Sequence, residues 1–106
     1  MECMRHNVIV VTSCDEKSII DAYFVAMDIF REISYLTPPA LNGCRSFFVP
    51  PDGSKEGQDD TNIGSNDRAQ FISWLQSTRD QKGNTPLDWI EVEFGGDKAY
   101  VATTST

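Results

Sequence analysis

Cys14 is the residue best placed for nucleophilic chemistry. It follows the β-branched run of residues 7–12 and precedes Asp15 and Glu16, at the expected start of a helix. Free amides and the helix dipole at such a position favour the thiolate. The two neighbouring carboxylates oppose it, and no glycine-rich phosphate-binding loop follows. The favoured interpretation of Cys14 is therefore a packed thiol without a catalytic role.

The segment 52–60 matches a calcium-binding loop in the spacing of its oxygen-bearing side chains. Ile63 occupies the position of the closing bidentate glutamate, and Lys55 within the segment repels a cation. The three cysteines and the single histidine lack the spacing of zinc ligands. We therefore predict no metal site, no cofactor and no catalytic residue set. The oxygen-bearing side chains of the segment belong to Asp52, Ser54, Glu56 and Asp60.

Charge points instead to binding. The net charge is −7, and residues 50–106 carry ten acids against five bases. Surplus carboxylates disfavour direct contact with nucleic acid and favour a basic protein partner, including one that itself binds nucleic acid. Aromatic side chains are enriched at protein interfaces. The predicted partner-binding residues are Trp89, Glu91, Glu93, Asp97, Tyr100, Asp59 and Asp60.

A hairpin would present most of these residues. Strict alternation over residues 88–94 predicts a strand, Gly95 and Gly96 predict a turn, and residues 99–103 predict a returning strand. We expect the aliphatic side of this hairpin to be buried, which leaves Trp89 and Tyr100 on an exposed acidic and aromatic side. The first strand carries Ile90, Val92 and Phe94 on one face and Trp89, Glu91 and Glu93 on the other.

The remaining pattern predicts one domain over residues 1–106. A strand over 7–12 leads into a helix from about Cys14 to about Ser34, with Ser13 and Glu16 as a capping box. A strand over 45–49, a long polar loop over 50–67 and a helix over 68–78 follow. The order β-α-β-α-β-β predicts an α+β two-layer sandwich with both helices on one face of an about four-stranded mixed sheet. Its first two strands are expected to be parallel.

The expected setting is a reducing cytoplasm. Cys3, Cys14 and Cys44 are odd in number and show no disulfide framework. No signal peptide or membrane-spanning run is apparent, so we predict no membrane partner. The apolar girdle of the first helix, which includes Val25 and Met27, leaves a homodimer open.

Three stretches resemble small, acidic, uncharacterised proteins encoded by bacteriophages and prophages: NGCRSFFVPPDGSKEG at 42–57, FISWL at 71–75 and PLDWIEVE at 86–93. The resemblance covers most of the chain and carries no assigned activity. It implies a phage accessory protein in the host cytoplasm, of the kind that binds and disables a host macromolecule such as a defence complex.

These observations favour a non-enzymatic, acidic protein-interaction module that binds or inhibits a host macromolecule. One alternative is a small-molecule or metal-binding domain, or an enzyme, with its site under the 50–67 loop near Cys14. A second alternative is a structural or assembly component of a phage.

Overall fold

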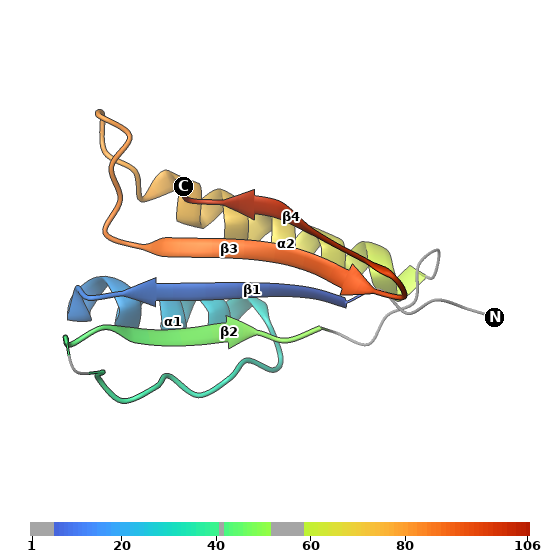
Figure 1. The fold of residues 1–106 in the computed structure, drawn as a ribbon, viewed down its shortest axis with the longest axis horizontal. Helices are drawn as coiled ribbons and strands as arrows, with labels where there is room; N and C mark the ends of the chain where they lie inside the picture. Colours follow the sequence, from blue (N-terminus) through green and yellow to red (C-terminus); the bar gives the residue numbers. More distant parts are fainter. Residues whose placement is uncertain (1–5, 41, 52–58) are drawn as a thin grey trace.

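The α+β class and the predicted order of elements are confirmed. The computed structural model describes residues 6–40, 42–51 and 59–106, with residues 59–65 described by their backbone alone. Two helices pack on one face of a four-stranded sheet (Figure 1). In chain order the elements are β1 (His6–Ser13), α1 (Glu16–Ile29), β2 (Arg45–Val49), α2 (Asp59–Ser77), β3 (Asp88–Gly95) and β4 (Lys98–Thr104).

The sheet is antiparallel throughout, so the predicted mixed sheet with a parallel first pair is wrong. Its strand order is β2-β1-β3-β4. The reason lies in the connection after α1, which ends at Ile29 rather than near Ser34. Residues 31–40 run in extended form beside β2, where Ser34 N donates to Phe48 O at 2.9 Å and Thr37 N donates to Ser46 O at 2.9 Å. This segment carries the chain back along the sheet before β2 begins, which reverses the direction of β2.

The core lies between the sheet and the helices. Alternate residues of the strands are buried there, because successive side chains of a strand point to opposite faces. Aromatic rings fill the space between α2 and β2, with Phe71 at 6.4 Å from Phe47 and at 5.7 Å from Phe30, centroid to centroid. The buried apolar residues are Ile9, Val11, Ile19, Ala22, Ala26, Phe47, Val49, Phe71, Ile72, Leu75, Leu87 and Trp89.

Helix α2 begins earlier than the sequence suggests. It starts at Asp59, so the predicted loop over 50–67 is wrong from that residue onward, and residues 52–58 lie outside the described structure. The site proposed under that loop therefore has no described geometry. The second half of α2 packs on the core through Phe71, Ile72 and Leu75. A stretch of weak helical tendency is thus drawn into a helix whose later turns are fixed by burial.

The predicted capping box at the start of α1 is also wrong. Asp15 is the N-cap, and its Oδ2 accepts a hydrogen bond from Ser18 N at 3.2 Å. Ser13 has another role: its hydroxyl accepts from Asp15 N at 3.0 Å and donates to Pro86 O at 2.6 Å. Ser13 therefore ties the end of β1 to the loop that precedes β3.

Replacement of Asp15 by alanine should lower the free energy of unfolding by about 1 kcal/mol, because one amide of the first helical turn loses its acceptor. Urea denaturation followed by circular dichroism measures the change. Asp21→Ala, at an exposed position within the same helix, is the control and should change stability by less than about 0.5 kcal/mol. Equal losses in the two variants would contradict the capping role.

Candidate functional site

The two faces of β3 are reversed relative to the prediction. Trp89 is 3% exposed and Glu91 is 8% exposed, both on the side covered by the helices. The register with β1 explains this, because Trp89 lies opposite Val11 and Glu91 lies opposite Ile9, two fully buried residues. The Arg79 guanidinium covers the Trp89 ring at 5.3 Å from its centroid. The predicted exposed aromatic pair of Trp89 and Tyr100 therefore does not form.

The other predicted binding residues are dispersed. Glu93 and Tyr100 lie on the helix side of the hairpin, where the Tyr100 hydroxyl donates to Glu93 Oε2. Asp97 is exposed in the β3–β4 turn. Asp59 and Asp60 lie in the first turn of α2, and their side chains lie outside the described structure. The predicted hairpin itself is confirmed. Phe94 lies opposite Ala99 and Val92 lies opposite Val101, which is one of the two registers that its turn allows.

A polar groove of about 310 Å³ brings together two of the predicted binding residues, Glu91 and Glu93. One wall is the side of α2 from Arg68 to Gln76, which includes Ile72. The opposite wall comes from the strands. We call this site the polar groove, and its strand residues are Asn7, Glu91, Glu93 and Thr103.

Hydroxyl groups of β4 orient both carboxylates of the polar groove. Thr103 Oγ1 donates to Glu91 Oε1 at 3.1 Å, and the Tyr100 hydroxyl donates to Glu93 Oε2. A β-bulge makes the first contact possible: the register shifts between Glu91 and Val92, so Glu91 lies opposite Thr103 rather than Ala102. The groove therefore offers two positioned, charged acceptors, which suit a hydrogen-bond donor or a cation.

The other side of the sheet is an open face. No described helix or strand lies over it (Figure 1), and Phe48, Phe94 and Val101 are exposed on it. The sequence does not reveal this surface, because the alternation of β3 favours Ile90 and Val92 as core residues. The outward-pointing residues that define the open face are His6, Val8, Val10 and Thr12; Ser46 and Phe48; Asp88, Ile90, Val92 and Phe94; and Ala99, Val101 and Thr104.

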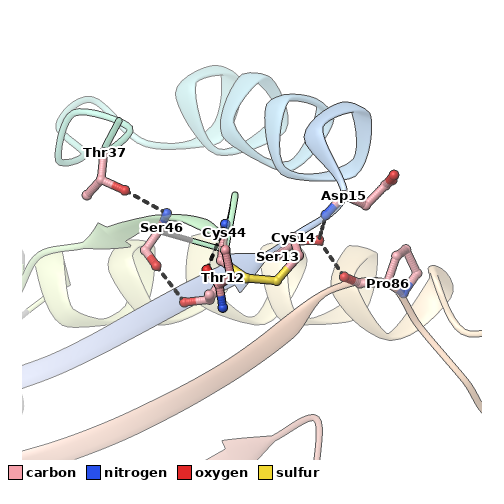
Figure 2. Close-up of a disulfide and its surroundings, with 9 residues drawn as sticks. Thr12, Ser13, Cys14, Asp15, Thr37, Cys44, Ser46 and Pro86 are labelled. Carbon is pink, nitrogen blue, oxygen red and sulfur yellow. Dashed lines mark hydrogen bonds between the residues drawn. A yellow bond between two sulfur atoms is a disulfide. The ribbon is translucent and has the colours of Figure 1, made fainter. Parts of the chain in front are cut away.

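Cys14 forms a disulfide with Cys44, so the prediction of unpaired cysteines is wrong (Figure 2). The antiparallel register accounts for the pair. Ser13 lies opposite Arg45, and the next position along both strands sets Cys14 opposite Cys44, with the two Cα atoms 3.8 Å apart. The inference of a reducing compartment from the cysteine pattern therefore loses its basis.

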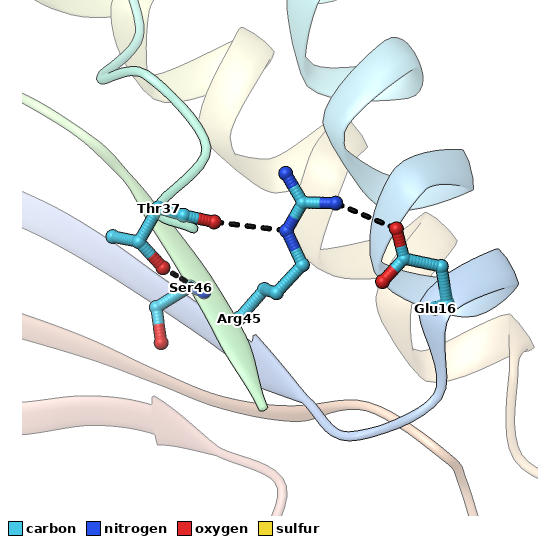
Figure 3. Close-up of polar contacts among 4 residues, drawn as sticks. All are labelled: Glu16, Thr37, Arg45 and Ser46. Carbon is cyan, nitrogen blue, oxygen red and sulfur yellow. Dashed lines mark hydrogen bonds and ion pairs between the residues drawn. The ribbon is translucent and has the colours of Figure 1, made fainter. Parts of the chain in front are cut away.

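Polar contacts reinforce the same corner of the fold. Arg45 Nη1 contacts Glu16 Oε1 at 2.6 Å, and Arg45 Nε donates to Thr37 O at 2.8 Å (Figure 3). The hydroxyls of Thr12 and Ser46 share a hydrogen bond of 2.8 Å (Figure 2). The disulfide thus lies where hydrogen bonds and an ion pair also connect α1, β1 and β2.

The part of the chain that the structure describes contains neither a candidate metal site nor a helix that could cross a membrane. Its His, Cys, Asp and Glu side chains form no group of three or more that could hold a metal ion. Its helices include none with the length and apolar character needed to cross a membrane.

Comparisons of the chain with protein-family models, with curated proteins and with solved structures gave no match.

Proposed function

We propose that this protein is a non-enzymatic interaction module that binds a basic segment of another protein in the polar groove. The observation that supports this function is the pair of carboxylates of Glu91 and Glu93, each held by a hydroxyl of β4. Preorganised acceptors lower the cost of binding, because the side chains are already ordered before the partner arrives.

The groove matches the chemistry of a lysine or arginine side chain. Such a side chain has an apolar stem and a charged head, and the stem packs on apolar surface while the head seeks acceptors. Ile72 and Ala69 supply apolar wall, and Glu91 and Glu93 supply the acceptors. Arg68 also lines the groove, and its positive charge disfavours a cation of the partner close to it.

The charge of the whole protein supports capture of a basic partner. A net charge of −7 raises the association rate of a positively charged protein, more strongly at low salt. The resemblance to phage-encoded proteins favours a host protein as that partner, for example a component of a defence complex or of a nucleic-acid-binding complex. In that setting the protein would act in the host cytoplasm.

Glu93→Gln tests this function, because it removes one groove charge and keeps the shape of the side chain. Binding of a fluorescein-labelled oligo-arginine peptide, measured by fluorescence anisotropy, should weaken about tenfold, the effect of losing one charge-assisted hydrogen bond. Tyr100→Phe, which removes the hydroxyl that orients Glu93, should weaken binding in the same direction.

Asp28→Asn is the matched control. It removes one carboxylate charge from an exposed position on α1, outside the residues that line the groove. We expect it to weaken binding by less than about twofold, the effect of a screened, distant charge. Equal weakening by Glu93→Gln and Asp28→Asn would show that only net charge matters, and would refute the groove as the binding site.

A further inference from the structure

The open face is ordered in rows of directly opposed residues that cross the strands. The two central rows are almost wholly apolar, and the outer rows are mixed. From one end of the sheet to the other, the rows are His6, Phe94 and Ala99; Val8, Val92 and Val101; Phe48, Val10, Ile90 and Thr104; and Ser46, Thr12 and Asp88.

Charge is nearly absent from this face. Of its thirteen defining residues only His6 and Asp88 are ionisable, and they lie at opposite ends of the sheet. The protein as a whole carries a net charge of −7, so most of its surface repels a second copy. The open face is therefore the surface on which two copies approach with the least repulsion. It also lacks the charges with which a basic partner would be selected.

We infer that a second copy of this chain covers the open face, so that two sheets pack face to face about a two-fold axis. Such a contact is self-complementary by symmetry, and it buries the same residues on both copies. The sheets would lie about 10 Å apart, as in other paired sheets.

The two end rows fix the direction of that axis. An axis across the strands sets the His6 end of one copy over the Asp88 end of the other, whereas an axis along the strands sets the Asp88 ends of both copies over each other. Like charges facing across an interface are disfavoured. The axis therefore runs across the strands.

Shape supports the same arrangement. A depression of about 230 Å³ lies at the Asp88 end, lined by Val10, Thr12, Ile90 and Thr104 among others. Phe94 is exposed at the other end. With the ends exchanged, Phe94 of each copy lies over the depression of its partner. The face thus carries both a projecting side chain and a hollow that can receive it.

The available area suffices for a dimer of modest affinity. Strands about 4.8 Å apart that rise about 3.3 Å per residue present roughly 400 Å² of flat area in a sheet of this size. Side chains project from that plane, so two copies would bury roughly 1,000 Å² of accessible surface in total. This lies near the lower limit of specific interfaces, and we expect a dimer that dissociates on dilution.

The test is sedimentation equilibrium of the full chain over a dilution series. The unmodified protein should change from dimer to monomer across the series. Val101→Lys places a charge on the open face at a position that is 52% exposed, so the fold accepts it. The dissociation constant of the dimer should rise about a hundredfold in this variant, because burial of an unpaired charge in the interface is costly.

Met27→Lys is the control, because Met27 is 51% exposed on α1 and lies outside the open face. It should leave the dissociation constant within about twofold, the scatter expected of a surface substitution. A protein that is monomeric at every concentration would overturn the inference, and so would a dimer broken by Met27→Lys but not by Val101→Lys. The polar groove lies on the other side of the sheet, so either outcome leaves the proposed function standing.

The direction of the axis has its own measurement. In a dimer mixed from labelled and unlabelled chains, an intermolecular nuclear Overhauser contact should join the Phe94 ring to the Thr12 methyl group. A contact between the two Phe94 rings would instead place the axis along the strands and overturn the end-to-end exchange.

Discussion

Replacement of Phe71 by alanine is expected to lower the free energy of unfolding by about 3–5 kcal/mol, the range for loss of a buried aromatic side chain. Phe71 of α2 is 0% exposed, and its ring contacts Phe30, the C-cap residue of α1, and Phe47 of β2. Its ring lies 5.7 Å from Phe30, 6.4 Å from Phe47 and 6.2 Å from Trp74. Truncation leaves a cavity with several walls, none of which can close it alone. A loss of this size is a large fraction of the stability of a small domain.

Urea denaturation measures this loss, and Phe24→Ala is the matched control. Phe24 has the same side chain but is 61% exposed on α1, so its truncation should change stability by less than about 0.5 kcal/mol. If Phe71→Ala does not fold, Phe71→Leu keeps most of the volume and should lose about 1–2 kcal/mol. Equal effects of truncation at positions 71 and 24 would contradict the core described above.

Reduction of the Cys14–Cys44 disulfide is expected to lower stability by roughly 3–4 kcal/mol. The two cysteines are 30 residues apart, and the bond removes the corresponding loop entropy from the unfolded chain. The double variant Cys14→Ser/Cys44→Ser should show the same loss without reductant and no further loss with it. Urea denaturation with and without dithiothreitol measures both effects.

Alkylation of the native protein followed by mass spectrometry gives an independent readout. Cys14 and Cys44 should resist alkylation until the protein is reduced. If both react in protein taken directly from its host, the bond does not form there, and the stability of the native protein should then be unchanged by dithiothreitol. The same measurement decides whether the predicted reducing setting holds.

Sequence patterning predicted the elements better than their arrangement. The β-branched run of β1, the alternation of β3 and the glycines of the hairpin turn are local signals, and the structure confirms the elements that they indicate. The direction of β2 is not a local property. It depends on where α1 ends, and Ile33 and Leu36 have the apolar spacing of a helix although they pack on the core from an extended segment.

The sequence does not indicate which faces of β1 and β3 are buried, and the candidate site depends on that choice. Both faces of β1 are β-branched, with Ile9 and Val11 on one and Val8 and Val10 on the other, so β1 does not mark its covered side. In β3 the aliphatic face looks like core and the Trp89 face does not, yet the pairing buries Trp89. The sequence predicts Glu91 and Glu93 as binding residues, but their place in a groove with α2 follows only from the tertiary structure. The disulfide likewise required the antiparallel register.

The extended segment beside β2 also limits how this protein can polymerise. Ser34 and Thr37 occupy the outward backbone groups of Ser46 and Phe48, through both main-chain and hydroxyl contacts. That border of the sheet cannot template another strand. Fibril growth by strand pairing needs two unpaired sheet edges per molecule, and among the described strands only β4 provides one. An extended segment of another molecule can therefore pair with β4, but the fibril cannot grow further from that pair.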